Sequence, residues 1–341
     1  MANKMEKLQA IVIGCGAIAG RYNEGASVSG TFSHSAAYKN HPGFDIAACV
    51  EPNQPRRAAF MDFWQIEQGF SDLDALCNSG IAFDVASICA PTPLHDTLLV
   101  DLAGTAVRGV FCEKPMTHNI HRTRTIATTY RKAKLPLAVN YTRRWNPSIR
   151  ELGIQIQEHK FGSLLSGIAI YDRGLLHHGS HMVDLIQMLV GPIQFRQLIA
   201  TKTGHSEHDP LCDAILTTNA GTPLTLIGID AGSAGLFELQ LVFSKAVVTL
   251  EDFSRHIRIR PSIPEPLTQE RTRFADGVTT ETRWVETLDH AFSEFYDSVC
   301  TGAPLSSDSI NAISAETICN EIHAVATQPN SSTAKKEANN D

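Results

Sequence analysis

The first residue that stands out chemically is a lysine at the end of an apolar run. Residues 107–112 (VRGVFC) are typical of a buried strand, and Glu113, Lys114 and Pro115 follow directly. If such a strand ends beside a bound substrate, the lysine ammonium group can polarise a substrate oxygen. With a lowered pKa it can also exchange that oxygen's proton. Lys114 is therefore a candidate catalytic residue.

A group of three histidines is the second candidate for proton exchange. His177, His178 and His181 are followed by Asp184, which shares a helix face with the last histidine. Imidazoles titrate near neutral pH, so they suit proton exchange with a hydroxyl group. Two other interpretations stay open: a metal site, and histidines that only cap a packed helix. No HExxH or CxxC pattern accompanies them, so we expect no metal.

A glycine-containing turn near the start of the chain is typical of dinucleotide binding. The apolar run of residues 8–13 leads into GCGAIA at residues 14–19. Gly14 permits a tight turn, Gly16 lets the backbone approach a pyrophosphate, and the small Ala19 allows the next helix to pack closely on a sheet. The N-terminus of that helix is expected to favour the anion. The motif predicts a Rossmann-type nucleotide site.

An acidic residue at the end of the second apolar run bears on which dinucleotide is bound. Glu51 can accept hydrogen bonds from both hydroxyls of an adenine ribose and repels a 2′-phosphate, which favours NAD over NADP. Its distance from the glycine turn is long, which indicates an insertion at residues 21–32 before a helix resumes at His34. Arg56 and Arg57 could meet a 2′-phosphate instead, but we interpret them as solvent-exposed helix residues.

A parallel sheet must position these groups. Short continuous apolar runs alternate with stretches of helical length, which is the pattern of βαβ units and of a sheet covered on both faces. Ligands bind at the carboxyl ends of such strands, where the glycine turn, Glu51 and Lys114 fall. The predicted strands are residues 8–13, 45–50, 84–89, 107–112 and 135–139, and the predicted helices are residues 54–65, 71–78, 94–103 and 119–133.

The second half of the chain predicts a different architecture. A strand at residues 163–171, a helix at residues 179–190 and closely spaced strand-like runs indicate an α+β domain with a mostly antiparallel sheet. We expect domains at residues 1–140 and 141–327 and a disordered tail at 328–341. Further strands are predicted at residues 194–202, 211–218, 223–230, 236–243, 246–251 and 256–260, and closing helices at 287–300 and 308–326.

The composition excludes several classes of protein. Of 341 residues, 43% are hydrophobic and 19% are charged, which rules out a fibrous or wholly disordered chain. The net charge of −7 shows no basic excess, so we expect no nucleic-acid partner. No apolar run approaches the ~20 residues of a membrane span. Eight cysteines without a CxxC pair, and no signal-peptide pattern, predict a reduced, cytoplasmic protein.

Together these motifs resemble the Gfo/Idh/MocA oxidoreductases, whose members include glucose–fructose oxidoreductase and inositol dehydrogenase. The resemblance extends from residue 11 to about residue 326, and it is specific as a set. It implies an N-terminal Rossmann domain and a C-terminal domain with a large open sheet, through which members commonly form dimers or tetramers. The matching segments are GCGAIA at residues 14–19, His34, APTPLH at 90–95, EKP at 113–115, NYTRRWNP at 140–147 and GSHMVDL at 179–185.

Resemblance and chain position together indicate which residues form the site. By resemblance, Lys114 and His181 match the catalytic lysine and histidine, and His177 assists them. The expected cofactor residues are Gly14, Cys15, Gly16, Ala17, Ile18, Glu51, Ala90, Pro91, Thr92, His95, Glu113, Lys114 and Asn140. The expected substrate residues are Lys114, Tyr141, Arg143, Arg144, Tyr171, His177, His178 and His181.

One departure from the family pattern concerns His177. Many members carry an aspartate at this position, four residues before the catalytic histidine, so His177 either replaces that aspartate or only holds substrate. The form LHHGSH resembles a subgroup associated with bacterial surface-glycan and sugar-nucleotide genes.

The sequence therefore predicts an NAD-dependent dehydrogenase that acts on a secondary alcohol or ketone of a sugar, cyclitol or sugar nucleotide and forms a homodimer or homotetramer. Hydride is expected to move between the carbinol carbon and nicotinamide C4, while Lys114 and His181 exchange the hydroxyl proton. Three alternatives stay open. They are an enzyme with tightly bound NAD and no net redox change, a non-catalytic NAD-binding regulator, and a metal-dependent hydrolase that uses the histidines.

Overall fold

The computed structural model describes residues 6–27, 29–206 and 208–328, which form two compact units. Unit 1 takes in Met1–Lys160, Ser254–Ile257 and Thr279–Glu316, and unit 2 takes in Phe161–Phe253, Arg258–Val278 and Thr317–Asp341, each over its described residues. The domain boundaries expected at residues 140 and 327 stay a prediction, because compactness alone does not define a folding domain. Apart from residue 328, the expected disordered tail lies outside the described residues.

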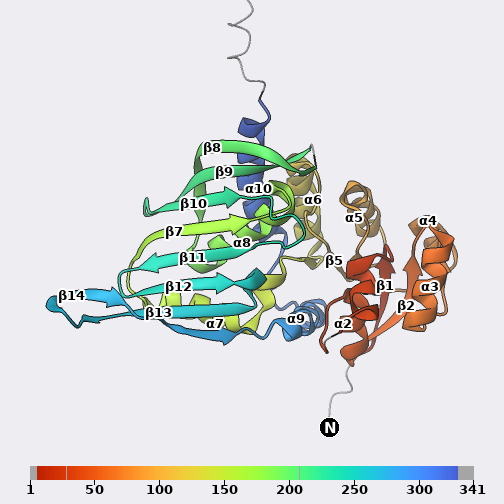
Figure 1. The fold of residues 1–341 in the computed structure, drawn as a ribbon. Helices are drawn as coiled ribbons and strands as arrows, with labels where there is room; N and C mark the ends of the chain where they lie inside the picture. Colours follow the sequence, from red (N-terminus) through yellow and green to blue (C-terminus); the bar gives the residue numbers. More distant parts are fainter. Residues whose placement is uncertain (1–5, 28, 207, 329–341) are drawn as a thin grey trace, which may run out of the picture. The chain divides into compact units, whose positions relative to one another are not determined.

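Unit 1 contains a parallel sheet that the apolar runs form. Its strands are β1 (Leu8–Ile13), β2 (Phe44–Val50), β3 (Gly69–Phe70), β4 (Val85–Ile88), β5 (Gly109–Cys112) and β6 (Leu137–Val139). Within the described residues they form a six-stranded sheet in the order β3-β2-β1-β4-β5-β6, which is the Rossmann order. Figure 1 labels β1, β2 and β5 of this sheet. The predicted strands lie where expected. The prediction missed β3 because two residues give no periodicity.

Five helices of unit 1 are preceded by a residue whose side chain caps the helix N-terminus. Side-chain oxygens of Ser33, Asn53, Asp72, Asn119 and Asn146 accept hydrogen bonds from backbone N–H groups of the first helical turns. These helices are α2 (His34–Asn40), α3 (Gln54–Trp64), α4 (Leu73–Asn78), α6 (Ile120–Ala133) and α7 (Pro147–Gln157), and they are joined by α5 (His95–Ala103) and α9 (Thr287–Thr301). The sequence prediction did not include α7.

A helix from the far end of the chain completes the core of unit 1. The Phe292 ring of α9 lies 4.6 Å from Tyr38 of α2 and 4.7 Å from Phe111 of β5, measured between centroids. Phe44 and Phe295 pack into the same aromatic cluster. Burial of such rings is a large apolar contribution to stability. The first sheet therefore depends on residues that the sequence analysis assigned to the second domain.

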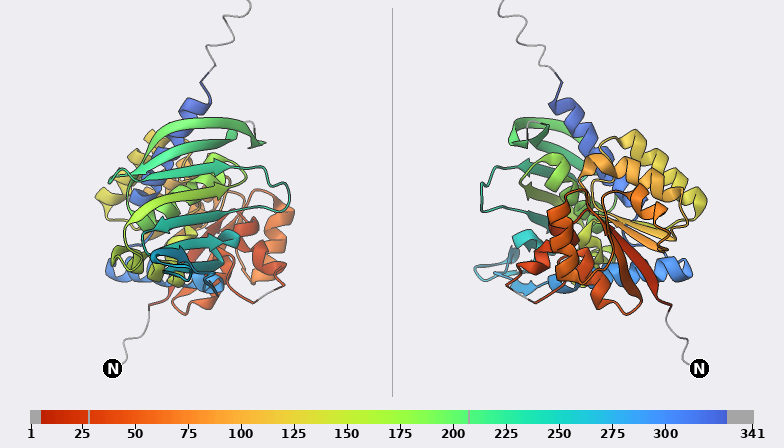
Figure 2. Two further views of the ribbon diagram at one scale, coloured as in Figure 1. Left: turned by 60° about the vertical axis from the view of Figure 1, so that its left-hand side comes forward. Right: turned by 90° about the vertical axis from the view of Figure 1, so that its right-hand side faces the viewer.

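Unit 2 contains the large open sheet (Figure 2). Its strands are β7 (Leu164–Tyr171), β8 (Ile193–Ser206), β9 (Asp209–Thr218), β10 (Pro223–Gly228), β11 (Glu238–Phe243), β12 (Ala246–Glu251), β13 (His256–Glu265) and β14 (Thr268–Phe274), with β15 (Val278–Glu281) paired to β13. Over the described residues the strand order is β14-β13-β12-β11-β7-β10-β9-β8. The β7–β10 pair is parallel, whereas β8–β9, β9–β10, β7–β11, β11–β12 and β13–β14 are antiparallel, so the expected mostly antiparallel sheet is confirmed.

The three helices predicted in the second half are present. They are α8 (Ser180–Val190), which contacts β7, α9 (Thr287–Thr301) and α10 (Ser309–Ala326). In the part of the chain that the structure describes, no helix combines the length and the apolar character needed to cross a bilayer.

Candidate active site

The turn after β1 is shaped by contacts within the protein. Gly14 has φ of +90°, and a Cβ there would lie 2.6 Å from the backbone nitrogen of Ala90, so conformation and space both require glycine. Gly16 has φ of −86°, and no atom lies within 4 Å of the position a Cβ would take. Protein packing therefore explains Gly14 but not Gly16, as expected if Gly16 is kept small for a ligand.

The helix predicted to follow this turn is interrupted. Ala17–Arg21 form the five-residue π-helix η1, three residues form α1 (Tyr22–Glu24), and α2 begins only at His34. The expected interruption by the insertion and the resumption of helix at His34 are therefore found. Helical residues do follow Gly16 directly, and support of a pyrophosphate by their N-terminus stays a prediction.

Glu51 joins the glycine turn to the end of β2. Its carboxylate accepts hydrogen bonds from the backbone N–H of Cys15 (3.1 Å) and of Asn53 (3.0 Å). Arg56 lies 3.5 Å from the same carboxylate; it is exposed as expected, but it is also paired. A cavity of about 340 Å³ adjoins this group, lined by Cys15, Arg21, Glu24, Arg56, Ala59 and Phe60. The ribose contact of Glu51 stays a prediction.

Glu113 lies at the centre of a buried polar chain. Its Oε1 accepts a hydrogen bond from the Asn140 side-chain amide (2.6 Å) and lies 3.0 Å from His34 Nε2, while His34 Nδ1 lies 3.0 Å from Ser87 Oγ. Burial alone would raise the pKa of Glu113, but His34, Asn140 and the neighbouring Lys114 bring that pKa below its ordinary value. The carboxylate is therefore ionised at neutral pH and holds the ends of β5 and β6 together.

Two further side chains fix the loop that carries Lys114. The buried His95 places its ring nitrogens 2.8 Å from the Ala90 carbonyl and 2.9 Å from the Pro115 carbonyl. The buried carboxyl of Glu316, on α10, accepts the backbone N–H of Met116 at 2.7 Å. Sequence reasoning missed Glu316, and it named His34 as a matching residue at the start of a helix, without a role in the site. Both act through contacts that span long stretches of chain, which leave no local pattern.

The loop after β4 carries the other expected nicotinamide residues. Pro91 is exposed and precedes the 3-10 turn η2 (Thr92–Leu94), of which Thr92 is half-buried. Their predicted contact with the cofactor stays a prediction.

The segment that follows β6, where substrate contacts were expected, is largely buried. Tyr141 and Arg143 are both buried. The Arg143 guanidinium donates from Nε to Ser254 Oγ (3.0 Å) and lies 5.4 Å from the centre of the Trp284 ring. Arg144 is half-buried. Arg143 thus has packing partners in unit 1, and the substrate contacts expected of these residues stay predictions.

In unit 2 the histidines lie on a π-helical turn and the start of α8. His177 and His178 belong to η4 (Leu175–Gly179), where their rings stack with centroids 4.8 Å apart, and the half-buried His181 follows on α8. His178 Nδ1 lies 2.6 Å from the buried Asp172 Oδ1. The family's aspartate is absent from position 177, but a carboxylate from the end of β7 joins the cluster at His178. The only signal for Asp172 was a polar residue directly after an apolar strand.

Asp209 fixes the turn that carries these histidines. Its two carboxylate oxygens accept the backbone N–H groups of Leu176 (2.7 Å) and His177 (3.0 Å). Tyr171, expected to contact substrate, is buried; its hydroxyl donates to the Cys212 carbonyl (3.0 Å) and accepts the Cys212 N–H (2.8 Å). The hydroxyl of Tyr171 is thus engaged by the backbone of β9.

A cavity of about 350 Å³ lies beside the histidines in unit 2. Carboxylates and a guanidinium among its walls suit a ligand rich in hydroxyl groups. Across residues 6–27, 29–206 and 208–328, no three His, Cys, Asp or Glu side chains are grouped as a metal ion requires. The lining residues of the cavity are Asp172, Arg173, His177, Leu211, Asp230, Ala231 and Gly232.

Comparison with known sequences agrees with the Rossmann architecture. Residues 8–141 match the Gfo/Idh/MocA family model, described as an oxidoreductase family with an NAD-binding Rossmann fold. A D-apiose dehydrogenase from Paraburkholderia graminis is 25% identical over 178 residues, which are 47% of this chain and 47% of that protein. The chain spans about half the length of the curated D-apiose dehydrogenases that it matches.

Solved structures resemble nearly the whole chain. The WlbA dehydrogenase from Bordetella pertussis, in complex with NADH and UDP-GlcNAcA, has a TM-score of 0.75 at 16% identity, over 95% of this chain and 97% of that one. A 3-ketoreductase from Actinomadura kijaniata, in complex with TDP-benzene and NADP, has a TM-score of 0.76 at 15% identity, over 94% and 98%. At these identities the likeness establishes the fold alone. The family model thus covers the Rossmann strands of unit 1, and over the rest of the chain the likeness is one of fold.

Proposed function

We propose that this protein is an NAD-dependent oxidoreductase that transfers hydride between nicotinamide and a secondary alcohol or ketone of a sugar, cyclitol or sugar nucleotide. The observation that carries the proposal is the grouping of the glycine turn, Glu51, Glu113 and Asn140 at the carboxyl ends of the Rossmann strands. The names of the D-apiose dehydrogenase and of the WlbA complex support a sugar-like substrate.

The residues at these strand ends fit a dinucleotide. Packing within the protein does not explain why residue 16 is a glycine. A pyrophosphate bound close to its backbone would explain it. Glu51 stands at the end of β2, where a ribose is held in this fold. When bound, the nicotinamide supplies the hydride donor or acceptor. The residues proposed to hold the dinucleotide are Gly14, Cys15, Gly16, Ala17, Ile18, Glu51, Ala90, Pro91, Thr92, His95, Glu113, Lys114 and Asn140.

We assign exchange of the substrate hydroxyl proton to Lys114 and His181. Lys114 directly follows β5 and Glu113, and its ammonium group is proposed to polarise the reacting oxygen. Asp172 fixes the ring orientation of His178, which we propose to contact substrate. His177 lines the cavity in unit 2 and is proposed to hold substrate there with Asp172 and Asp230.

The choice between NAD and NADP depends on the cavity beside Glu51. The carboxylate favours NAD, because it repels a 2′-phosphate. Arg21 and Arg56 line the same cavity, and two guanidinium groups suit a phosphate. We propose NAD as the preferred cofactor and expect measurable binding of NADP.

We also propose that the outer face of the unit 2 sheet joins two copies of the chain. Ile168 of β7 is 45% exposed, and Ile170, Ile215 and Ile227 are partly exposed. Strand pairing places Ile170 opposite Ile227, while Thr225 lies opposite both Ile168 and Ile215. The solvent face of an antiparallel sheet is normally polar, so these isoleucines support a covered face.

The proposal is tested with a lysine variant and a matched control. Lys114→Met should lower turnover by about 10²–10⁴-fold and weaken NAD binding far less, because the main role proposed for the ammonium group is to act on the reacting oxygen. Lys132→Met, at an exposed position of α6, should change neither quantity. The measurements are NADH formation with a panel of sugars, cyclitols and sugar nucleotides, and calorimetric titration with NAD. Full activity of Lys114→Met would overturn the assignment, and failure to bind NAD or NADP would overturn the function itself.

A further inference from the structure

Over its described residues, the insertion at residues 21–32 lines two cavities of unit 1. Arg21 and Glu24 lie in the wall of the cavity beside Glu51. Other residues of the insertion line a second cavity, of about 470 Å³. One short segment therefore borders both cavities, and neighbouring residues within it line different ones. The residues of the insertion that line the second cavity are Tyr22, Gly25, Ala26, Ser27, Thr31 and Phe32.

The two cavities adjoin different parts of the proposed dinucleotide site. Glu51 follows β2 and accepts the N–H of Cys15, which lines the first cavity. Asn140 follows β6 and lines the second cavity together with Ile18. The strand order places β2 and β6 on opposite sides of β1, whose glycine turn is expected to hold the pyrophosphate. A dinucleotide that extends from Glu51 to Asn140 would therefore border the insertion on both sides of its pyrophosphate.

An asparagine holds the shape of the insertion. Asn23 donates from its side-chain amide to the Gly30 carbonyl (2.8 Å), and its side-chain oxygen accepts the Phe32 N–H (3.0 Å). The Ser33 hydroxyl donates to the same oxygen at 2.8 Å. The two ends of the loop are therefore joined across its base, as in compact surface loops.

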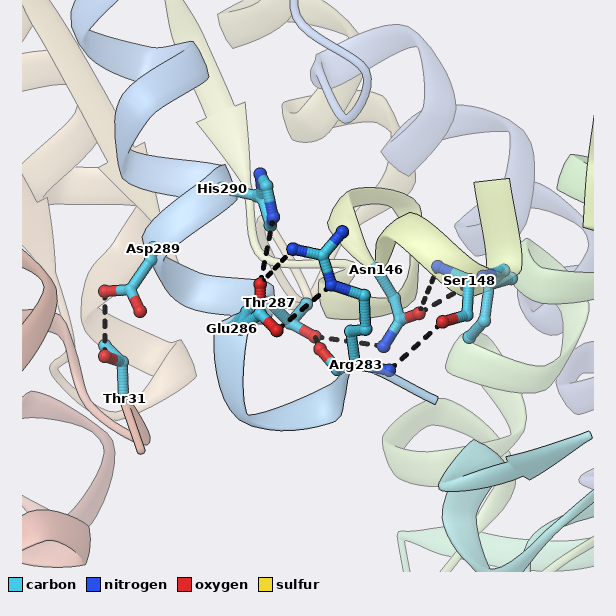
Figure 3. A network of polar contacts seen from close by, with 9 residues as sticks. Thr31, Asn146, Ser148, Arg283, Glu286, Thr287, Asp289 and His290 are labelled. Carbon is cyan, nitrogen blue, oxygen red and sulfur yellow. Dashed lines mark hydrogen bonds and ion pairs between the residues drawn. The ribbon is translucent and has the colours of Figure 1, made fainter. Parts of the chain in front are cut away.

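Thr31 fastens the loop to the 3-10 turn η6 (Trp284–Glu286), called the Trp284 turn, and to α9. Its N–H donates to the Val285 carbonyl (3.1 Å), and its hydroxyl donates to Asp289 (2.8 Å), a contact that Figure 3 shows. The Asn40 side-chain amide donates to the same hydroxyl at 2.8 Å. Single hydrogen bonds contribute modestly to stability, so these contacts can open without unfolding of unit 1.

Other contacts hold the Trp284 turn itself in place (Figure 3). The Arg283 N–H donates to Ser148 Oγ (3.1 Å), and the Arg283 guanidinium pairs with Glu286. The Asn146 side-chain amide donates to Thr287 Oγ1 at 3.1 Å. The turn is thus anchored before and after the indole, and the insertion is attached to a fixed point.

We infer that the insertion is a strap that closes over the bound dinucleotide and slows its release. It continues directly from the helical turn after Gly16 and is fastened again at Thr31, so opening of the Thr31 contacts is the step that frees the cofactor. Tyr22 is 55% exposed and lines the second cavity, where a bound ring would cover it. The inference rests on the proposed function, because the strap acts on the cofactor that this function requires.

Release of the reduced cofactor tests the strap without any substrate. The full-length protein is loaded with NADH, or with NADPH if only that cofactor binds. An excess of the oxidised cofactor then displaces it, while energy transfer from tryptophan to the reduced nicotinamide is followed over time. Trp284 lines the second cavity and so provides a donor at the proposed site.

Thr31→Val should release the cofactor at least about fivefold faster than the parent, because the variant loses the hydroxyl bonds to Asp289 and Asn40. Asn23→Ala should act in the same direction, because it opens the base of the loop. Thr129→Val removes a hydroxyl from an exposed position of α6 and should release the cofactor at the parent rate.

Hydrogen exchange tests closure of the strap in the parent protein, without a variant. Saturating cofactor should slow amide exchange at residues 21–32 by about tenfold or more, because closure makes the bonds of the Thr31 and Phe32 N–H groups persist. The amides of α4 serve as the internal reference and should exchange at an unchanged rate.

The outcomes separate this inference from the proposed function. Release at the parent rate in Thr31→Val, or exchange at residues 21–32 that the cofactor does not change, would overturn the strap and leave the proposed function standing. Protection that depends on protein concentration and not on cofactor would assign the insertion to a contact between copies and also overturn the strap. Failure of the parent to bind either NADH or NADPH would refute the proposed function and the strap together.

Discussion

Around Lys114, the buried polar side chains act mainly by fixing loops. Glu113 holds Asn140 and His34, and His95 bridges the loops after β4 and β5. A buried polar group that lost its partner would cost about 1–3 kcal/mol, so these contacts strongly restrict where the strand ends can lie. The residues that carry the proposed chemistry are therefore placed by neighbours that need not touch substrate.

The two glycines of the first turn should respond differently to alanine. Gly14→Ala should lower the free energy of unfolding by about 2 kcal/mol or more, because a Cβ at φ +90° would meet Ala90 at 2.6 Å. Gly16→Ala should change it by less than about 1 kcal/mol yet weaken NAD binding at least about tenfold, because its Cβ occupies space needed by the pyrophosphate. Urea denaturation and NAD titration measure both effects. Unchanged NAD affinity in Gly16→Ala would argue against the dinucleotide turn.

At the scale of elements, helices distant in sequence complete structures begun near the N-terminus. The α9 helix supplies Phe292 and Phe295 to the core under the Rossmann sheet. The α10 helix supplies Glu316, which holds the backbone after Pro115. The insertion is likewise fixed by Asp289 on α9. The conformation of the loops that follow the strands is thus fixed by packing against helices that are distant in sequence.

Glu316 gives this element-scale contact a pH dependence. Burial raises its pKa from 4.5 to about 7, although the Met116 N–H, the Thr123 hydroxyl and Lys114 oppose the shift. The raised pKa means that the folded state holds the proton more tightly than the unfolded state. The associated stability is therefore fully present below about pH 4.5 and is lost as the pH rises through about 7.

Glu316→Gln should remove this loss, because the amide has no proton to release and keeps an oxygen for Met116. At about pH 8 the variant should be more stable than the parent by up to about 3 kcal/mol, and near pH 4.5 the two should be similar. Urea denaturation across this pH range measures the difference. Parallel stability curves for the two proteins would show that Glu316 titrates normally in the folded state.

At the scale of the whole molecule, one face of the unit 2 sheet carries several isoleucines that are exposed or partly exposed. These isoleucines support the proposed association of two copies, whereas the fold does not establish the number of subunits. Association would bury this surface and contribute roughly 25 cal/mol for each Å² of apolar area removed from water.

The double substitution Ile168→Lys and Ile227→Lys should convert an oligomer to a monomer, because two ammonium groups would otherwise be buried in the interface. Ile310→Lys, at an exposed position of α10, is the matched control and should keep the parent mass. Light scattering after gel filtration measures the mass. A monomeric parent, or a double variant that keeps the parent's oligomeric mass, would exclude this face as the interface.

The sequence by itself determined every strand of the Rossmann sheet except β3, the glycine turn, and the strand-end positions of Glu51 and Lys114. Apolar runs, glycines and capping residues act on the backbone within a few residues, so their effect can be predicted from the local sequence. Only the tertiary structure decided that Glu113 meets His34 and Asn140, that Asp172 holds His178, and that the insertion lies against the Trp284 turn. Such contacts join side chains far apart in sequence, and long-range packing leaves no periodic signal by which a sequence can reveal it.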